Sequence, residues 1–322
     1  MSAAAVRIAL WLNASAICDR AGCHWPMNST DAAPRNHPYL SDSLYYGPAG
    51  VALFLQQLAS TQAPGGKDNT WRDLAGRALD ASRSAVPSAL ESFGPNAGFY
   101  YGLLGIAYGL RAGSDGLAPS LDAAAAQIEA HVLETVLPLS ANASAVLWNN
   151  TDVAHGAAGS GLYLLWLSRR KMLSPTARRA ALEAAVRAGE WLLSRAEPAA
   201  PPSDGLRWAR GPDTDGDHLH AYYPTFCCGS SGVAYFLSEL SQARVSPSEA
   251  AVLGAALRSR LLDAAERGAA HLLSLAVEEP PSSGGMLLPH EEECVHRHAG
   301  MHTHACLHVH ACIRVLLPLD EE

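Results

Sequence analysis

Charged residues are scarce in this sequence, and long hydrophobic runs are absent. Asp, Glu, Lys and Arg together make up 17% of the 322 residues, whereas hydrophobic residues make up 48%. This composition excludes a disordered chain and indicates a globular protein with a large core. No stretch reaches the roughly 18 apolar residues that a membrane-spanning helix needs. We therefore expect no integral membrane segment, and peripheral association with a membrane stays open.

Basic residues are also few. The chain has 23 Lys and Arg against 31 Asp and Glu, a formal net charge of −8. Nucleic-acid binding usually depends on a basic surface, so we expect no nucleic acid as a partner. Strand-forming residues are sparse and alanine is abundant, which favours helix throughout.

The seven cysteines do not have the spacing of a disulfide framework. Their number is odd, and adjacent Cys227 and Cys228 are poor partners for each other. We therefore expect a reducing compartment and a cytoplasmic location. Residues 3–18 have some features of a signal peptide, but a polar Asn13 interrupts the apolar stretch and favours an ordinary first helix.

A short glycine motif occurs four times along the chain. The copies are YGPAG at 46–50, YGLLG at 101–105, HGAAG at 155–159 and CGSSG at 228–232, and their first glycines lie 55, 54 and 73 residues apart. Each copy opens an apolar segment, which is followed by a polar break and a second helical segment. The second segments are residues 71–86, 121–137, 177–195 and 250–275. This recurrence predicts a repeated helical hairpin, with an insertion in the longest interval.

Two glycines in each motif have a predicted structural role at the start of the first helix of the hairpin. Glycine tolerates a positive φ angle and lets another backbone approach closely, and a tight turn at a crowded centre needs both. The motif glycines are Gly47, Gly50, Gly102, Gly105, Gly156, Gly159, Gly229 and Gly232.

The two segments of each hairpin differ in polarity. The segments that follow the glycines, such as VALFLQQL and SGLYLLWL, are apolar on nearly all sides, and the second segments carry the Arg, Glu and Asp residues. This difference predicts an all-α fold, an α/α toroid in which an inner ring of helices is covered by an outer ring. The alternative is an open solenoid of helix pairs.

Three residues in or beside the motifs are candidates for catalysis. Asp152 and His155 could exchange protons with a substrate, although Asp152 could instead only cap the following helix. Cys228 has the same place in the fourth motif that His155 has in the third. A thiol at a helix N-terminus can act as a ligand or nucleophile, and the alternative is a buried, inert residue.

The C-terminal segment is rich in histidine and cysteine, both of which are natural zinc ligands. The residues are His290, Cys294, His296, His298, His302, His304, Cys306, His308, His310 and Cys312. Their spacing matches no structural zinc pattern, so we assign no metal ligand. We expect an irregular or aberrant tail that binds metal adventitiously.

The four motifs together resemble the lanthionine synthetase C-like family, over about residues 40–293. The resemblance implies a toroid of seven helical hairpins, of which about four are expected here. It also implies a zinc-dependent reaction in which a thiol, from a peptide cysteine or from glutathione, adds to a dehydrated Ser or Thr to form a thioether. Asp152 matches an Asp that the family places three residues before the motif histidine and that is proposed to transfer protons. In some cyclases a histidine stands where this chain has Cys228.

Two departures from the family pattern concern the metal. The family's zinc ligands lie in a W-C-x-G-x-x-G repeat and a C-H-G-x-x-G repeat, and neither motif occurs in this sequence. We therefore expect a chain truncated at the C-terminus that lacks the family's zinc site, with an inactive relative as one outcome.

The sequence predicts three possible functions and one division of the chain into segments. The functions are thioether formation or glutathione addition, a non-catalytic module that binds a peptide or protein, and a carbohydrate-active α/α toroid. The last would need paired carboxylates, and only Asp152 qualifies among the motif turns. The predicted segments are an N-terminal helical segment at 1–39, a partial toroid at 40–293 and a tail at 294–322. Substrate and oligomeric state are not predicted.

Overall fold

The computed structural model describes most of the chain, in two compact units at Met1–Leu147 and Trp148–Glu322. The described residues are 3–25, 41–61, 69–93, 96–114, 118–136, 150–199, 203–211, 222–246, 249–275, 277–278 and 286–287. The His/Cys-rich tail and the predicted domain boundaries at 39/40 and 293/294 lie outside them. Within the described part, no helix is long and apolar enough to cross a membrane.

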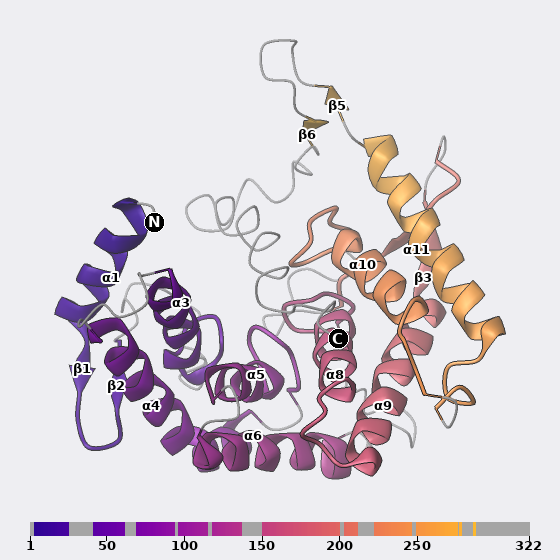
Figure 1. Cartoon of the computed structure of the whole chain (residues 1–322). Helices are drawn as coiled ribbons and strands as arrows, with labels where there is room; N and C mark the ends of the chain where they lie inside the picture. The colour runs from indigo at the N-terminus through magenta and orange to yellow at the C-terminus, as the bar shows by residue number, and fades with distance from the viewer. Residues whose placement is uncertain are drawn as a thin grey trace. The chain divides into compact units, whose positions relative to one another are not determined.

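The first unit contains two helical hairpins (Figure 1). Helix α3 (Pro48–Ser60) packs on α4 (Thr70–Ser92), and α5 (Leu103–Ser114) packs on α6 (Pro119–His131). A short π-helix, η2 (Val132–Val136), continues α6. The hairpins contact each other through α3 and α5 and through α4 and α6. The two hairpins predicted for this part of the sequence are confirmed.

The second unit repeats the arrangement. Helix α8 (Ala157–Ser168) packs on α9 (Pro175–Ser194), and α10 (Ser230–Ser241) packs on α11 (Ala255–Leu275). The hairpins contact each other through α8 and α10 and through α9 and α11. Helix α11 begins later than the predicted residue 250, because residues 250–253 form turns.

The longest interval between motifs holds the predicted insertion. Two short strands, β3 (Ala196–Pro198) and β4 (Leu206–Trp208), pair in antiparallel register between α9 and α10 in the sequence. Strand β4 packs against α11, where Trp208 is fully buried and its indole N–H donates to the carbonyl of Leu192 at 2.8 Å. The insertion is therefore anchored in the core, and this anchor fixes the position of Ala209, Arg210 and Gly211, which follow Trp208. Another antiparallel pair, β5 (Val277–Glu278) and β6 (Met286–Leu287), follows α11.

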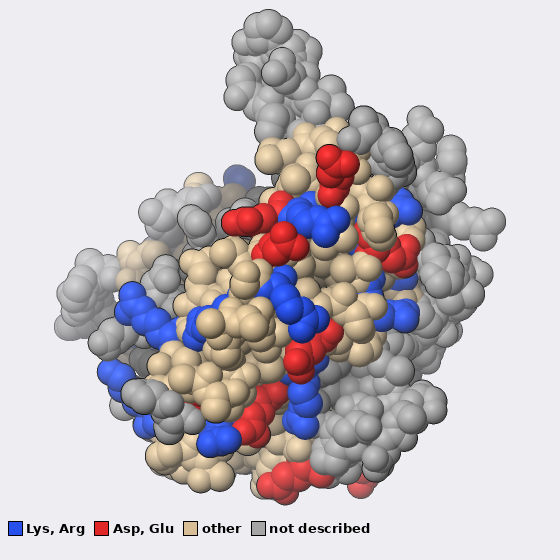
Figure 2. Space-filling model, turned by 90° about the vertical axis from the view of Figure 1, so that its right-hand side faces the viewer, with Lys and Arg blue, Asp and Glu red and all other residues tan. Residues whose placement is uncertain are grey.

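Burial matches the predicted difference in polarity most clearly at α5 and α8, whereas α3 leaves most of the segment VALFLQQL partly exposed. Every residue of α8 from Ala157 to Leu167 is buried, whereas α11 buries Leu261, Ala264, Ala265 and Gly268, which lie on one face at helical spacing. The other faces of the second helices carry charges. On the side of the molecule shown in Figure 2, basic and acidic side chains lie intermixed rather than gathered by sign. The all-α fold class is confirmed.

One buried ion pair links α5 and α6. The guanidinium of Arg111 donates to both carboxylate oxygens of Glu129, at 2.9 and 2.7 Å, and also to Asp122 at 3.2 Å. Arg111 and Glu129 are each 6% exposed. Two parallel bonds fix the relative orientation of guanidinium and carboxylate, so this pair holds the hairpin in one register.

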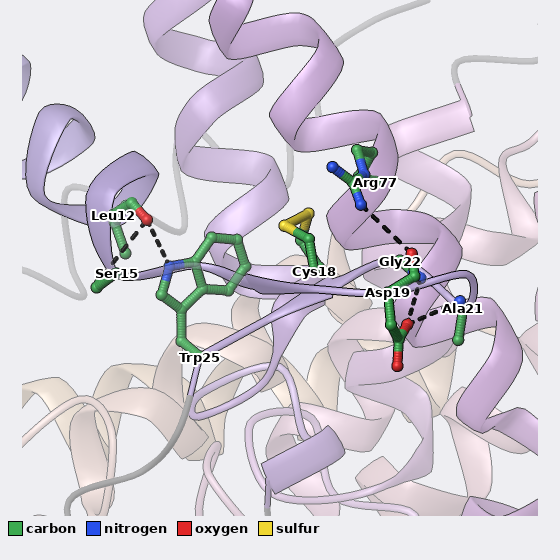
Figure 3. The surroundings of a disulfide bond; sticks show 9 residues. Leu12, Ser15, Cys18, Asp19, Ala21, Gly22, Trp25 and Arg77 are labelled. Atoms are coloured by element: carbon green, nitrogen blue, oxygen red, sulfur yellow. Dashed lines mark hydrogen bonds between the residues drawn. A yellow bond between two sulfur atoms is a disulfide. The ribbon is translucent and has the colours of Figure 1, made fainter.

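The N-terminal segment forms a helix and a disulfide-closed hairpin (Figure 3). Helix α1 (Ala3–Ser15) is followed by β1 (Ile17–Cys18) and β2 (Cys23–His24), and Cys18 is bonded to Cys23. The predicted first helix is confirmed, but the expectation of cysteines outside disulfides is wrong for this pair. The reason is local: the turn between the strands places Cys18 directly opposite Cys23 in the antiparallel register.

The disulfide hairpin packs on α4. Gly22 has a φ of 140°, and a Cβ there would lie 2.3 Å from the carbonyl oxygen of Arg77. Arg77 in turn donates to the carbonyl of Asp19 at 3.3 Å, as Figure 3 shows. Only glycine fits both the backbone angle and the close approach, so Gly22 allows this hairpin to lie against the helix.

Candidate functional site

The glycine turns share one backbone geometry. The residue after the first glycine donates its N–H to the carbonyl six residues before that glycine, as Leu103, Ala157 and Ser230 do at 2.8–3.1 Å. The first copy has Pro48 at that position and cannot make the bond. There Gly47 donates to Ser43 instead, at 2.7 Å.

Close approach, not positive φ, is why the turns need glycine. Gly47, Gly156 and Gly229 are N-cap residues in extended conformations, so the predicted need for positive φ is wrong for these three copies. The predicted close approach is confirmed. A Cβ would lie 2.2 Å from the Asn150 carbonyl oxygen at Gly156 and 1.9 Å from the Tyr223 carbonyl oxygen at Gly229. The chain entering each helix folds back over its first turn, and any side chain would collide with backbone.

A second bond joins neighbouring turns. Tyr45 donates its N–H to the Tyr100 carbonyl at 3.0 Å in the first unit, and Ala154 donates to the Cys227 carbonyl at 3.0 Å in the second. Each of these four residues lies two positions before the first glycine of its own turn. Val153 adds a further bond to Cys227 at 3.2 Å. The third and fourth turns, which hold all three catalytic candidates, therefore lie side by side.

Asp152 is fully buried at the base of the third turn. Its Oδ1 accepts the backbone N–H of His155 at 2.7 Å and of Gly156 at 3.1 Å. These bonds satisfy two backbone N–H groups of the turn. Asp152 therefore has a role close to the helix capping that the sequence offered as the alternative. The other oxygen, Oδ2, accepts from the Nε of Arg210 at 3.0 Å, so the carboxylate also belongs to a charged cluster.

Arg210 reaches this cluster from the insertion. It lies two residues after Trp208. The residues on either side of Arg210 are hydrogen-bonded to the third turn. Thr151 donates to the Ala209 carbonyl at 3.0 Å, and Gly211 donates its N–H to the Asn150 side chain at 2.9 Å. Sequence reasoning missed Arg210, because only the anchored insertion brings residues 58 positions apart together.

His155 is the exposed member of the cluster. Its Nδ1 lies 3.3 Å from Nη2 of Arg210 and 3.6 Å from Oδ2 of Asp152, and its side chain is 33% exposed. Because arginine only donates, an unprotonated Nδ1 accepts from Arg210, whereas a protonated Nδ1 faces the carboxylate. Both protonation states of the imidazole thus have a partner on the same side of the ring.

The electrostatics favour a charged carboxylate. Burial is the largest single influence on the pKa of Asp152 and raises it, but the hydrogen bonds and charges of His155 and Arg210 together outweigh burial and hold that pKa below its ordinary value. Asp152 is therefore an anion at neutral pH that orients the imidazole. It is not itself placed to exchange protons with a substrate.

Cys228 stands beside a second thiol. Its Sγ lies 3.4 Å from the Sγ of Cys227, which is buried, whereas Cys228 is partly exposed. Cys228 directly precedes Gly229, the N-cap of α10. The structure thus places the predicted Cys228 in the turn next to His155, and adds Cys227 as its neighbour.

The corresponding turns of the first unit hold aromatic rings instead. Tyr45 contacts Tyr46, Tyr100 and Tyr101, with ring centroids 4.8, 6.5 and 5.0 Å apart. Tyr46 and Tyr101 also contact each other at 5.7 Å. We call these four residues the tyrosine cluster. Its phenol rings offer an amphipathic surface rather than an acid–base group.

The described residues do not gather a metal-binding set. Among them, no three His, Cys, Asp or Glu side chains are grouped so that they could hold a metal ion. The histidines and cysteines of 290–312 lie outside the described part of the chain.

One family model matches this chain. The family model described as lanthionine synthetase C-like protein matches residues 38–207, just over half of the chain. Solved structures also match, among them nisin cyclase, with 18% sequence identity, a TM-score of 0.48 and coverage of 76% of this chain. The chain spans 61% of the nisin cyclase chain. No curated protein sequence matches.

Proposed function

Because this chain belongs to the lanthionine synthetase C-like family, we propose that it promotes the addition of a thiol to a dehydrated Ser or Thr residue of a peptide. The nucleophile is a peptide cysteine or a small thiol of the glutathione kind. The observation that supports this proposal is the partly exposed imidazole of His155, which contacts the fully buried Asp152 and its partner Arg210.

The reaction has two proton movements that a positioned imidazole can serve. The thiol loses its proton as sulfur bonds to the β-carbon of the dehydrated residue, and the α-carbon gains a proton as the double bond is lost. We assign both proton movements to the imidazole of His155, whose Nδ1 is oriented by Arg210 and Asp152. Asp152 and Arg210 are positioning residues that keep the ring in place through either transfer.

Zinc, which the family resemblance implies, has no fitting set among the described residues. We therefore derive no step through zinc from these residues. We expect less than one zinc per chain in purified protein, with or without residues 294–322, measured by elemental analysis. One zinc per chain that disappears on deletion of 294–322 would assign a metal site to the histidines and cysteines of that segment.

The proposed function is tested with a peptide that contains dehydroalanine. We expect the full chain to accelerate formation of the thioether with an added small thiol, measured by mass spectrometry as the mass of the adduct. His155→Gln should slow this reaction by about a hundredfold, the usual scale for loss of a general acid–base group. Exposed His24→Gln is the matched control and should leave the rate unchanged.

Two results would overturn the proposal. Wild-type protein that gives only the uncatalysed rate would refute thioether formation, and equal rates for wild type and His155→Gln would refute the role of the imidazole. Binding of the peptide without acceleration would instead favour the non-catalytic module. The tyrosine cluster supports that second candidate, because amphipathic aromatic rings suit peptide recognition.

The cytoplasmic location predicted from cysteine usage stays a prediction. The Cys18–Cys23 disulfide argues against it, since such bonds persist mainly in oxidising compartments. Fractionation of cells that produce the protein, followed by detection of the chain, decides the question directly.

A further inference from the structure

The two thiols of the fourth turn differ in exposure and lie close together. The Sγ atoms of Cys227 and Cys228 are 3.4 Å apart, against about 2.05 Å in a disulfide. Cys228 is partly exposed, so a reagent can reach it, and Cys227 is buried next to it. An accessible thiol with a shielded neighbour is the arrangement in which one cysteine reacts first and the other resolves the product.

We propose that Cys227 and Cys228 form a dithiol site that small disulfides oxidise reversibly. In the first step the Cys228 thiolate attacks a disulfide RSSR, which forms a mixed disulfide with Cys228 and releases one thiol, RSH. In the second step Cys227 attacks the Cys228 sulfur, which forms the Cys227–Cys228 bond and releases a second RSH. Overall the two cysteines are oxidised, and RSSR is reduced to two RSH.

Covalent geometry makes this bond strained. Adjacent residues have Cα atoms about 3.8 Å apart, whereas disulfides usually span about 4.4–6.8 Å. The peptide group between Cys227 and Cys228 must therefore rotate or distort when the ring closes. Strained disulfides are readily reduced, so the site can return to the dithiol when the thiol concentration rises.

That same peptide group supports the third turn. Its carbonyl, belonging to Cys227, accepts the N–H groups of Val153 and Ala154, which lie between Asp152 and His155 in the chain. Rotation of the peptide group would weaken these two bonds. Oxidation of the dithiol should therefore loosen the turn that positions the imidazole.

Peptide mapping tests the chemistry without any assay of activity. Trypsin cleavage after Arg210 and Arg244 releases residues 211–244, whose only cysteines are Cys227 and Cys228. The folded full chain is treated with hydroxyethyl disulfide, alkylated under denaturing conditions and digested. We expect this peptide to lose both alkylation sites and to be lighter by two hydrogens, and dithiothreitol should restore both sites.

Single variants separate the two steps. Cys227→Ser should accumulate a stable mixed disulfide on Cys228, and Cys228→Ser should react several times more slowly, because Cys227 is buried. Circular dichroism checks that both variants fold. The proposal is overturned if the wild-type peptide keeps both alkylatable thiols, or if it retains one or two hydroxyethylthio groups in mixed disulfides instead of an internal bond.

Amide hydrogen exchange tests the link to the third turn. We expect the amides of Val153 and Ala154 to exchange about tenfold faster in the oxidised chain. The amide of Arg178, bonded to Ser174 in another part of the unit, is the control and should not change. Unchanged exchange at Val153 and Ala154 would refute the link.

A slower thioether reaction after oxidation is also expected, and this readout alone rests on the proposed function. If the wild-type chain proves inactive, the proposed function fails while peptide mapping and hydrogen exchange still decide the dithiol site.

Discussion

The two pairs of glycine turns have the same backbone and different side chains. In the first unit the turns are joined by the bond from Tyr45 to Tyr100, and in the second by the bond from Ala154 to Cys227. Around the first pair lie four tyrosines, whereas the second pair holds Asp152, His155, Cys227 and Cys228. The glycines therefore build the frame, and the residues beside them decide whether a pair of turns carries aromatic rings or carboxylate, imidazole and thiol groups.

The insertion explains why only the second pair has a charged cluster. Arg210 follows the buried strand β4 and supplies the cation that makes a fully buried Asp152 tolerable. An unpaired carboxylate there would be costly, because burial disfavours the charged form. The first unit also contains a buried arginine, but Arg111 joins two helices of one hairpin and faces no motif histidine.

Loss of a motif glycine should have the largest effect and test the shared frame. Gly156→Ala places a Cβ against the Asn150 carbonyl oxygen, and we expect the second unit to lose more than about 3 kcal/mol of stability. Gly102→Ala, which meets backbone at 2.4 Å, should destabilise the first unit similarly. Hydrogen exchange of peptides from each unit measures the two effects separately.

A glycine outside the motifs provides the control for that experiment. A Cβ at Gly76 in α4 would meet nothing within 4 Å, so Gly76→Ala should stabilise by up to about 1 kcal/mol. Wild-type stability in Gly156→Ala would show that the turn can relax, and the frame argument would fail.

Arg210→Ala should separate positioning from packing. It leaves Asp152 with two backbone donors, so we expect a moderate loss of stability, about 1–3 kcal/mol. The kcat for thioether formation should fall by about tenfold with KM little changed, because the imidazole loses one of the groups that orient its Nδ1. Arg179→Ala removes an exposed pair with Glu183 and should cost less than about 1 kcal/mol without changing kcat. An unchanged kcat in Arg210→Ala would contradict the positioning role.

Acid should weaken the second unit through Asp152. Its pKa in the folded chain is held below the ordinary 3.8, so the charged carboxylate contributes stability above that pH. This contribution disappears as the pH falls through the folded pKa. The difference in unfolding free energy between wild type and Asp152→Asn should therefore shrink on acidification below 3.8, measured by denaturant titrations at several pH values. A constant difference would place the source of the acid sensitivity elsewhere.

Tyr45→Ala should have the smallest effect. Tyr45 is 38% exposed, and its ring contacts contribute about 1 kcal/mol to the first unit. The rate constant for thioether formation should not change, since no acid–base group is lost. A large fall in that rate constant would mean that the tyrosine cluster takes part in the chemistry, which would break the contrast between the two units.

Much of the fold could be predicted because its cause is local. Glycine spacing marked the hairpins, and the polarity of each segment separated helices buried on all sides, such as α8, from those with one buried face, such as α11. The α/α toroid is the fold implied by the family to which the chain belongs. The Cys18–Cys23 disulfide was not predicted, because it depends on which residues a short turn brings opposite each other.

The sequence by itself determined the repeated hairpin, the family, and Asp152, His155 and Cys228 as candidates, since each is written in a short motif. Only the tertiary structure decided which groups they contact. It brought Arg210 to Asp152 across 58 residues, turned the His155 ring toward that pair, and showed that Cys228 has Cys227 within 3.4 Å. The reason is physical: backbone collisions at glycine act over a few residues, whereas a buried charge is satisfied by whichever partner the packed chain carries to it.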